Sequence, residues 1–151
     1  MKHLISSVLA CVTFFVSVSV NAQDVMIARS KLNFPEAMSS LQNAIIDHKY
    51  TLSRVQRIDI GLTKAGFKTD MYRVVFFGKQ KELKWISDEY PGLAAYLPLK
   101  IAIFAEGEEA VAVALDPGHY IQVANDARLK GIYDRWASDV KSILKVFRTS
   151  E

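Results

Sequence analysis

Hydrophobic and polar positions along the chain alternate between a helical period and a strand period. Apolar side chains three and four residues apart predict helices over residues 35–48 and 126–148. Asn33 precedes Pro35 and Glu36, which is the pattern of a capped helix start. A short polar helix is predicted over 79–90, because Pro91-Gly92 follows it. The last helix has one long apolar stripe: Leu129, Ile132, Trp136, Val140, Ile143 and Phe147.

Runs of β-branched, aromatic and other apolar residues predict the strands between these helices. The strands are expected at 24–32, 50–60, 71–78, 99–105 and 110–116. Residues 61–70 contain two glycines and are expected to form a loop or a wide hairpin. The order β-α-β-β-α-β-β-α predicts an α+β fold. We expect a two-layer sandwich, with a mainly antiparallel sheet of about five strands and the helices on one face.

The two strands around the turn at 106–109 are expected to present two contrasting faces. We expect a large-residue face of Leu99, Ile101, Ile103, Val111, Val113 and Leu115. We expect the other face to carry Lys100, Ala102, Phe104, Ala110, Ala112 and Ala114. Alanine side chains make this second face shallow, so either a helix packs closely on it or a ligand fills the space.

The N-terminal segment has the layout of a secretory signal. Lys2 and His3 precede an uncharged, mostly apolar run over 4–20, and the segment ends with Val20 and Ala22 at the positions a signal peptidase reads. We expect cleavage after Ala22 and a periplasmic or secreted protein without stable membrane insertion. Two alternatives stay open: an uncleaved anchor, or lipid attachment at Cys11 after the "VLAC" stretch.

Removal of residues 1–22 would leave one domain over 23–151 and would also remove Cys11, the one cysteine of the chain. A disulfide, a thiol nucleophile and a thiolate metal site would then be excluded. The chain has 19 basic and 16 acidic residues, and this small excess is spread along it rather than clustered. The charge therefore does not indicate a nucleic-acid partner.

The stretch "VAVALDPGHYI" (111–121) holds the first candidate site, because Asp116, His119 and Tyr120 follow a strand end. A carboxylate can orient an imidazole for acid-base chemistry, and Ser53 or Thr63 would have to approach as the nucleophile. The competing interpretation is a turn, since Asp before Pro-Gly bonds backbone amides two residues on. On that interpretation Gly118 is expected to adopt a backbone angle that a side chain would disfavour.

A few other residues are candidates for binding an anion or a metal ion. Lys100 lies next to Pro98 and could hold an anionic ligand, with Arg54 and Arg73 beside it if the three share a face. His48, His119 and Asp116 are the residues from which a metal site could be assembled, but no spacing requires one. The chain has no phosphate-binding loop, because "GLTKAG" (61–66) lacks the Lys-Ser/Thr ending. We therefore expect no metal and no cofactor.

Three stretches closely resemble the domain of unknown function 302 family: "YRVVFFG", "LAAYLPLKIAIFAEGEEAVAVALDP" and "RWASDVKSIL". The resemblance covers about 28–147 and is most specific at Leu97-Pro98 and Asp116-Pro117. Trp136 and Asp139 favour the branch with an added C-terminal helix. The resemblance implies a small two-layer α/β domain, often exported, and implies no reaction.

The chain departs from the pattern of that family in two places. Many relatives have Asn-Pro after the central strand, where this chain has Gly78-Lys79-Gln80, and some have a cysteine where it has Leu99. A thiol-dependent or Asn-Pro-dependent function of relatives therefore does not transfer.

We expect an exported, non-catalytic domain that binds a small molecule or a partner protein, with Lys100, Asp116, His119 and Tyr120 as ligand-binding residues. The alternative is a hydrolase-like or isomerase-like enzyme that uses Asp116 and His119. A further alternative is an interaction module that associates through a sheet edge, as a homodimer for example.

Overall fold

The computed structural model describes residues 25–68, 71–123 and 126–150, with the side chains of 121–123 left out. The expected signal segment and Cys11 lie outside the described residues. None of the helices among the described residues is long and apolar enough to span a membrane.

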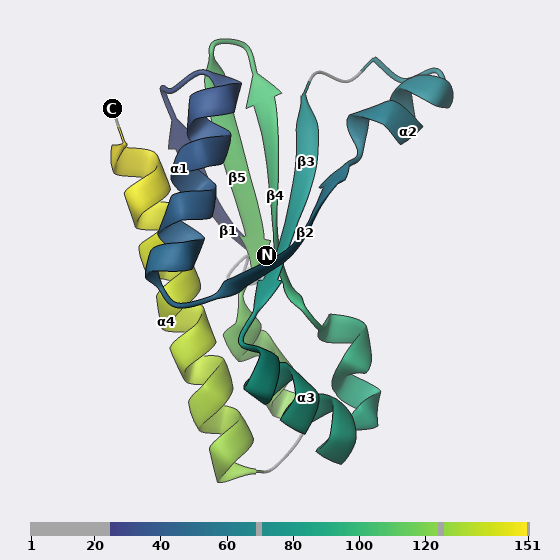
Figure 1. Ribbon diagram of the computed structural model, residues 1–151, viewed down its shortest axis with the longest axis vertical. Helices are drawn as coiled ribbons and strands as arrows, with labels where there is room; N and C mark the ends of the chain where they lie inside the picture. The colour runs from purple at the N-terminus through teal and green to yellow at the C-terminus, as the bar shows by residue number, and fades with distance from the viewer. Residues whose placement is uncertain (1–24, 69–70, 124–125, 151) are drawn as a thin grey trace, which may run out of the picture.

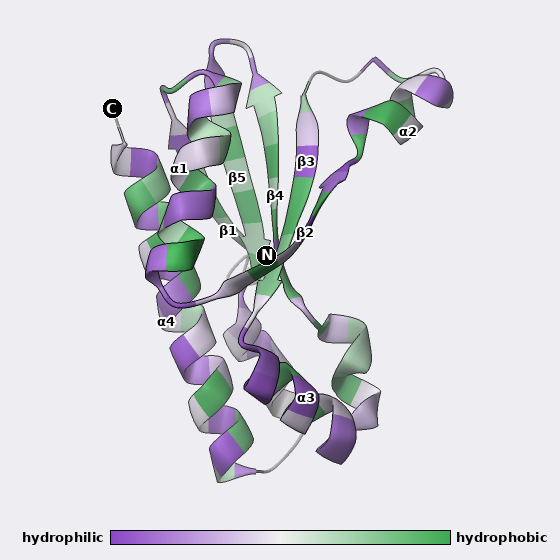
Figure 2. Cartoon of the chain, viewed as in Figure 1, coloured by the Kyte–Doolittle hydropathy of each residue, from purple (hydrophilic) through white to green (hydrophobic). Residues whose placement is uncertain are grey.

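Five strands form one antiparallel sheet in the order β1-β5-β4-β3-β2, which confirms the expected α+β fold. The strands are β1 (Val25–Ser30), β2 (Thr51–Arg57), β3 (Tyr72–Gly78), β4 (Leu99–Glu106) and β5 (Glu109–Leu115). The outer strands β1 and β2 are the two edges of the sheet. The central strands are apolar over most of their length (Figure 2).

Helices α1 (Phe34–Asp47) and α4 (Ala127–Thr149) pack side by side on one face of the sheet (Figure 1). The expected cap is present, because the side chain of Asn33 accepts a hydrogen bond from the N–H of Glu36 at 3.1 Å. The shorter helices are α2 (Asp59–Lys64), α3 (Gln80–Glu89), η1 (Pro91–Tyr96) and η2 (Pro117–Val123). α2 lies at one end of the sheet, and α3 lies at the other end (Figure 1).

The predicted strand over 50–60 extends three residues too far at its C-terminal end. The strand ends at Arg57, and the chain turns into α2 at Asp59, where a loop was expected to follow the strand. Asp59 explains this turn, because its carboxylate lies 3.2 Å from the guanidinium of Arg57 and 2.7 Å from that of Arg73. An acidic residue in the first turn also favours a helix start. Ile58 and Ile60 therefore do not extend the strand face that contains Leu52.

The expected faces of the β4–β5 hairpin are wrong. Ile101 lies directly opposite Ala114, and Ile103 lies opposite Ala112, so the alanines of β5 share a face with the isoleucines of β4. The chain reverses over an even number of residues, and this changes which positions pair across the hairpin. α1 and α4 cover this mixed face, and its residues are buried. The space over the alanines is therefore filled by helices.

The opposite face of the sheet, which we name the open face, carries Lys100 and a set of apolar side chains. Its members follow from the strand registers: Val25, Ile27, Tyr72, Val74, Phe76, Ala102, Phe104, Val111, Val113 and Leu115. The side chains of Ile27, Leu115 and Val25 are 63, 46 and 44 % exposed. A sheet with helices on one side only leaves such a face without a second layer.

Candidate functional site

The turn after β5 is held by the first candidate residue, Asp116. Its carboxylate accepts a hydrogen bond of 2.8 Å from the N–H of Gly118, and its carbonyl accepts one of 3.1 Å from the N–H of His119. The second carboxylate oxygen lies 3.7 Å from the ammonium of Lys141 on α4. Asp116 thus connects the end of β5 to the start of η2 and to the last helix.

At Gly118 a side chain would be opposed by its close neighbours and not by the backbone angle. The positive-φ glycines of the described residues are Gly66 and Gly107, so the expected special backbone angle at Gly118 is wrong. A Cβ at Gly118 would lie 3.1 Å from Oδ1 of Asp116 and 3.7 Å from Cβ of Ala137. The first distance is tighter than ordinary packing allows, so a side chain here would push against the hydrogen-bonding carboxylate.

The nucleophiles considered for acid-base chemistry lie far from Asp116 and His119. Ser53 is on the edge strand β2, with β4 and β3 between it and β5, which is about 14 Å at ordinary strand spacing. Thr63 is on α2, beyond the opposite end of the sheet (Figure 1). His119 is exposed at the surface of the turn. The fold therefore does not bring these hydroxyls to the turn.

Tyr120 belongs to a column of aromatic rings beneath the turn. Its ring centroid lies 4.4 Å from that of Tyr96 and 6.1 Å from that of Tyr133, which in turn contacts Trp136 at 5.2 Å. Burial, and then the proximity of Tyr96, raises the pKa of Tyr120. The indole N–H of Trp136 donates to Glu82 at 2.8 Å. This column joins η1, η2, α3 and α4 into one unit.

Lys100 lies at the start of β4, which pairs with the end of β5, so it is at the same end of the sheet as Asp116. It is exposed on the open face, opposite Phe76 of β3, whose other neighbour is Arg54 of β2. Arg73 lies on the covered face, where it pairs with Asp59. The three cations therefore do not form one pocket, although Lys100 and Arg54 do share a row.

His48 fastens α1 to α4. Its Nδ1 lies 2.7 Å from the carbonyl oxygen of Ala44, and its Nε2 lies 3.0 Å from Oγ of Ser142. Within the described residues, no group of three His, Cys, Asp or Glu side chains is arranged to hold a metal ion.

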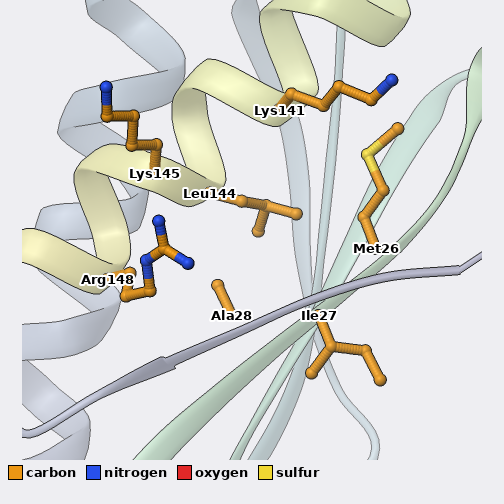
Figure 3. Close-up of a pocket in the computed structure, with 7 residues that line it drawn as sticks. All are labelled: Met26, Ile27, Ala28, Lys141, Leu144, Lys145 and Arg148. Atoms are coloured by element: carbon orange, nitrogen blue, oxygen red, sulfur yellow. The ribbon is translucent and has the colours of Figure 1, made fainter.

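A groove between β1 and α4 is the candidate site that the structure adds. It is a cleft of about 190 Å³ lined by Met26, Ile27, Ala28, Lys141, Leu144, Lys145 and Arg148. The close-up in Figure 3 shows Met26, Ala28 and Leu144 on its floor and Ile27 pointing to the other side of the sheet. Three consecutive residues of β1 line the groove, so the strand's backbone edge is part of its wall.

The charge of this groove is positive along one side. Lys141, Lys145 and Arg148 follow one another at four-residue and three-residue spacing on α4, which places them on one face of the helix. Lys141 has Asp116 as its carboxylate partner at 3.7 Å. The groove thus has an apolar floor, a cationic rim and an open strand edge, and Lys141 connects it to the turn after β5.

Comparison with known proteins establishes the family. The model of a domain of unknown function, DUF302, matches residues 26–147. The chain belongs to the DUF302 family. A solved structure of an uncharacterized DUF302 protein from Bacillus stearothermophilus superposes with a TM-score of 0.73 at 15 % identity, covering 84 % of this chain and 100 % of that one. A search of curated proteins finds no match.

The DUF302 fold also gathers residues that the sequence did not bring together. The hydroxyl of Tyr50 donates to Asp139 at 2.7 Å, and the ammonium of Lys79 lies 3.8 Å from that carboxylate and 4.6 Å from the centre of the Tyr50 ring. Burial, and then the hydrogen bond to Asp139, raises the pKa of Tyr50.

The basic residues Lys141, Lys145 and Arg148 of α4 were visible in the sequence, but no sequence pattern placed them beside the first strand.

Proposed function

We propose that this DUF302 domain is an exported, non-catalytic binding domain that takes up an extended, acidic segment of a partner protein in the β1–α4 groove. The observation that carries the proposal is the combination of an edge strand with a cationic helix row above it. Edge strands present unpaired N–H and C=O groups to any chain that can add a further strand.

The size of the groove favours a peptide over a larger small molecule. Its volume of about 190 Å³ is below the range of roughly 300–1,000 Å³ that is usual for ligand pockets. A peptide strand needs only shallow space, because most of its polar contacts are backbone hydrogen bonds along β1. Leu144 and Met26 supply an apolar contact for one inward side chain.

The spacing of the cations predicts the pattern of the partner. Lys141 and Lys145 are four residues apart on a helix, about 6 Å along its axis. Alternate side chains of a strand are about 6.8 Å apart. A segment with Asp or Glu at positions i and i+2 would therefore place both carboxylates against the helix row, where charge-assisted contacts also speed association.

Binding of a fluorescently labelled peptide with alternating Glu and Val residues to the protein purified from cells tests this proposal. Anisotropy is expected to rise with the peptide, and Lys145→Glu and Arg148→Glu are each expected to weaken binding about tenfold or more. Lys130→Glu is the matched control, because Lys130 is an exposed lysine of the same helix that pairs with Asp134 away from the groove.

A second peptide separates strand addition from simple charge attraction. N-methylation of alternate amides on the bonding edge removes the backbone donors and is expected to abolish binding at constant charge. Equal binding of the methylated peptide, or equal binding of a free anion such as citrate, would contradict the proposal. Unchanged binding by Lys145→Glu and Arg148→Glu would contradict the location.

A further inference from the structure

The open face has the composition of half a protein core. Along one middle row, Ile27, Val113, Ala102 and Val74 lie side by side. The next row contains Arg29 on the edge strand, the buried Val111, and then Phe104 and Tyr72. We infer that a second copy of this chain packs on this face, sheet against sheet, to form a four-layer homodimer with the helices outside. The interface shares only Ile27 with the β1–α4 groove, and the Ile27 side chain points to the open face. The inference holds whether or not the groove binds a peptide.

The charges on the open face select the partner. Lys100 lies in the row at one end of β4, next to Phe76 of β3, and Arg54 of β2 lies on the other side of Phe76. Glu106 and Glu109 pair at the other end of the β4–β5 hairpin, where Arg29 binds both. One end of the face thus carries two cations, and the other carries two carboxylates and one guanidinium. A face with a positive end and a negative end is complementary to its own copy.

The same charges determine the symmetry axis. A two-fold axis across the strands turns the partner's β4 end for end, so Lys100 of each copy lies over Glu106 of the other. A two-fold axis along the strands would place Lys100 over Lys100. Like charges opposed across an interface are unfavourable, so the first arrangement is selected. Such isologous contacts are the usual basis of a homodimer.

The area of the face reaches the minimum for a specific pair. Strands spaced about 4.8 Å apart with rises of about 3.4 Å per residue give a plane of roughly 24 by 22 Å, or about 500 Å². Two such faces bury about 1,000 Å², the lower limit for a specific interface. Packed sheets sit about 10 Å apart at an angle of about 30°, and the side chains of Phe104 and Phe76 have the length to fill that gap.

The axis also has a consequence for the groove. Rotation about an axis across the strands leaves β1 of both copies on the same side of the dimer. The two β1–α4 grooves would therefore open on one side, in opposite directions. A partner with two acidic segments could then occupy both.

Sedimentation equilibrium of the protein purified from cells tests the inference, with the mass expected to be twice that of the chain. Ala102→Arg places a charged side chain in the middle of the open face and is expected to raise the dimer dissociation constant about 100-fold. The matched control is Ile46→Arg on α1, because Ile46 is 51 % exposed away from this face and its substitution is expected to leave the dimer intact.

A charge exchange tests the axis. Lys100→Glu and Glu106→Lys are each expected to weaken the dimer about tenfold, and the double variant is expected to recover to within about threefold of the parent. Thermal melts of each variant establish that the fold is retained. A monomer at all concentrations would overturn the inference, as would a dimer that Ala102→Arg leaves unchanged. Failure of the double variant to recover would overturn the arrangement of Lys100 over Glu106.

Discussion

The carboxylate of Asp116 holds the N–H of Gly118 at 2.8 Å, directly after β5 ends. This bond directs the chain from the sheet into η2, and η2 brings Tyr120 onto Tyr96 and Tyr133. The stretch from Asp116 to Tyr120, which looks most like a catalytic motif in the sequence, therefore also connects the sheet to the last helix. A catalytic site and a structural turn at Asp116 differ in the loss of stability that they predict for substitutions there.

Replacement of Asp116 by Ala is expected to lower the free energy of unfolding by about 0.5–1.5 kcal/mol, because a backbone N–H loses its partner. Asp116→Asn keeps an acceptor oxygen and is expected to cost less. His119→Ala is expected to cost under about 0.5 kcal/mol, since the residue is exposed. Urea denaturation of the three variants measures this. A fully stable Asp116→Ala protein would contradict the structural role.

The sequence predicted most of the fold because strong periodic patterns coincide with single elements. The apolar stripe from Leu129 to Phe147 is buried against η2, β1 and α1, and belongs to one helix, α4. Prediction failed where the secondary structure of a segment depended on residues distant in the sequence. Asp59 starts α2 because Arg57 and Arg73 lie beside it, and Arg73 is on the next strand.

The candidate site was less predictable because a site depends on which surfaces meet. The side of the sheet on which Lys100 lies depended on the register of the β4–β5 hairpin, and a shift of one position exchanges the two faces. The basic residues of α4 became part of a groove only because the last helix packs beside the first strand. No local pattern relates residues that are more than a hundred positions apart.

A side chain at Gly78 is expected to destabilise the protein, although Gly78 lies in the extended strand β3. A Cβ there would lie 2.4 Å from Cδ1 and 2.9 Å from Cγ of Leu83, so the Leu83 side chain would have to shift. Gly78→Ala is expected to destabilise the protein by about 1–3 kcal/mol through this overpacking. Gly92→Ala is the control, because nothing lies within 4 Å of a Cβ at that position. Equal melting temperatures for the two variants would contradict this explanation.

Replacement of Lys49 by glycine is expected to stabilise the protein. It follows the end of α1 with a φ of 63°, and its N–H donates to the carbonyl of Ile46 at 2.8 Å. A left-handed residue after a helix end is ordinarily glycine, because a Cβ is strained there. Lys49→Gly is therefore expected to raise the free energy of unfolding by about 0.5–1 kcal/mol. Chemical denaturation measures the gain, and a loss of stability would contradict it.

Export is expected to remove residues 1–22, since the segment has a basic start, an apolar run and small residues before Gln23. Intact-mass spectrometry of the protein recovered from cells is expected to show a chain that begins at Gln23. Ala22→Arg blocks the small-residue site and is expected to leave the precursor uncut. A chain beginning at Met1 in the parent, or a lipid-modified Cys11, would contradict the cleavage.

Tyr50 is expected to make the protein less stable in alkaline solution. Burial and the hydrogen bond to Asp139 raise its pKa in the folded state, whereas an unfolded tyrosine ionises near pH 10. The unfolded chain therefore loses this proton first, so the contribution to stability is complete below about pH 10 and declines as the pH rises beyond it. Tyr50→Phe is expected to reduce this decline, and at pH 7 to cost about 1.5–3 kcal/mol, because the lost bond is to a carboxylate. Part of the alkaline decline is expected to remain, since burial also raises the pKa of Tyr133. Denaturation curves at pH 7 and at intervals from pH 8 to about pH 11 measure the cost of the substitution and the alkaline decline in stability. An identical pH dependence in parent and variant would contradict the role of Tyr50.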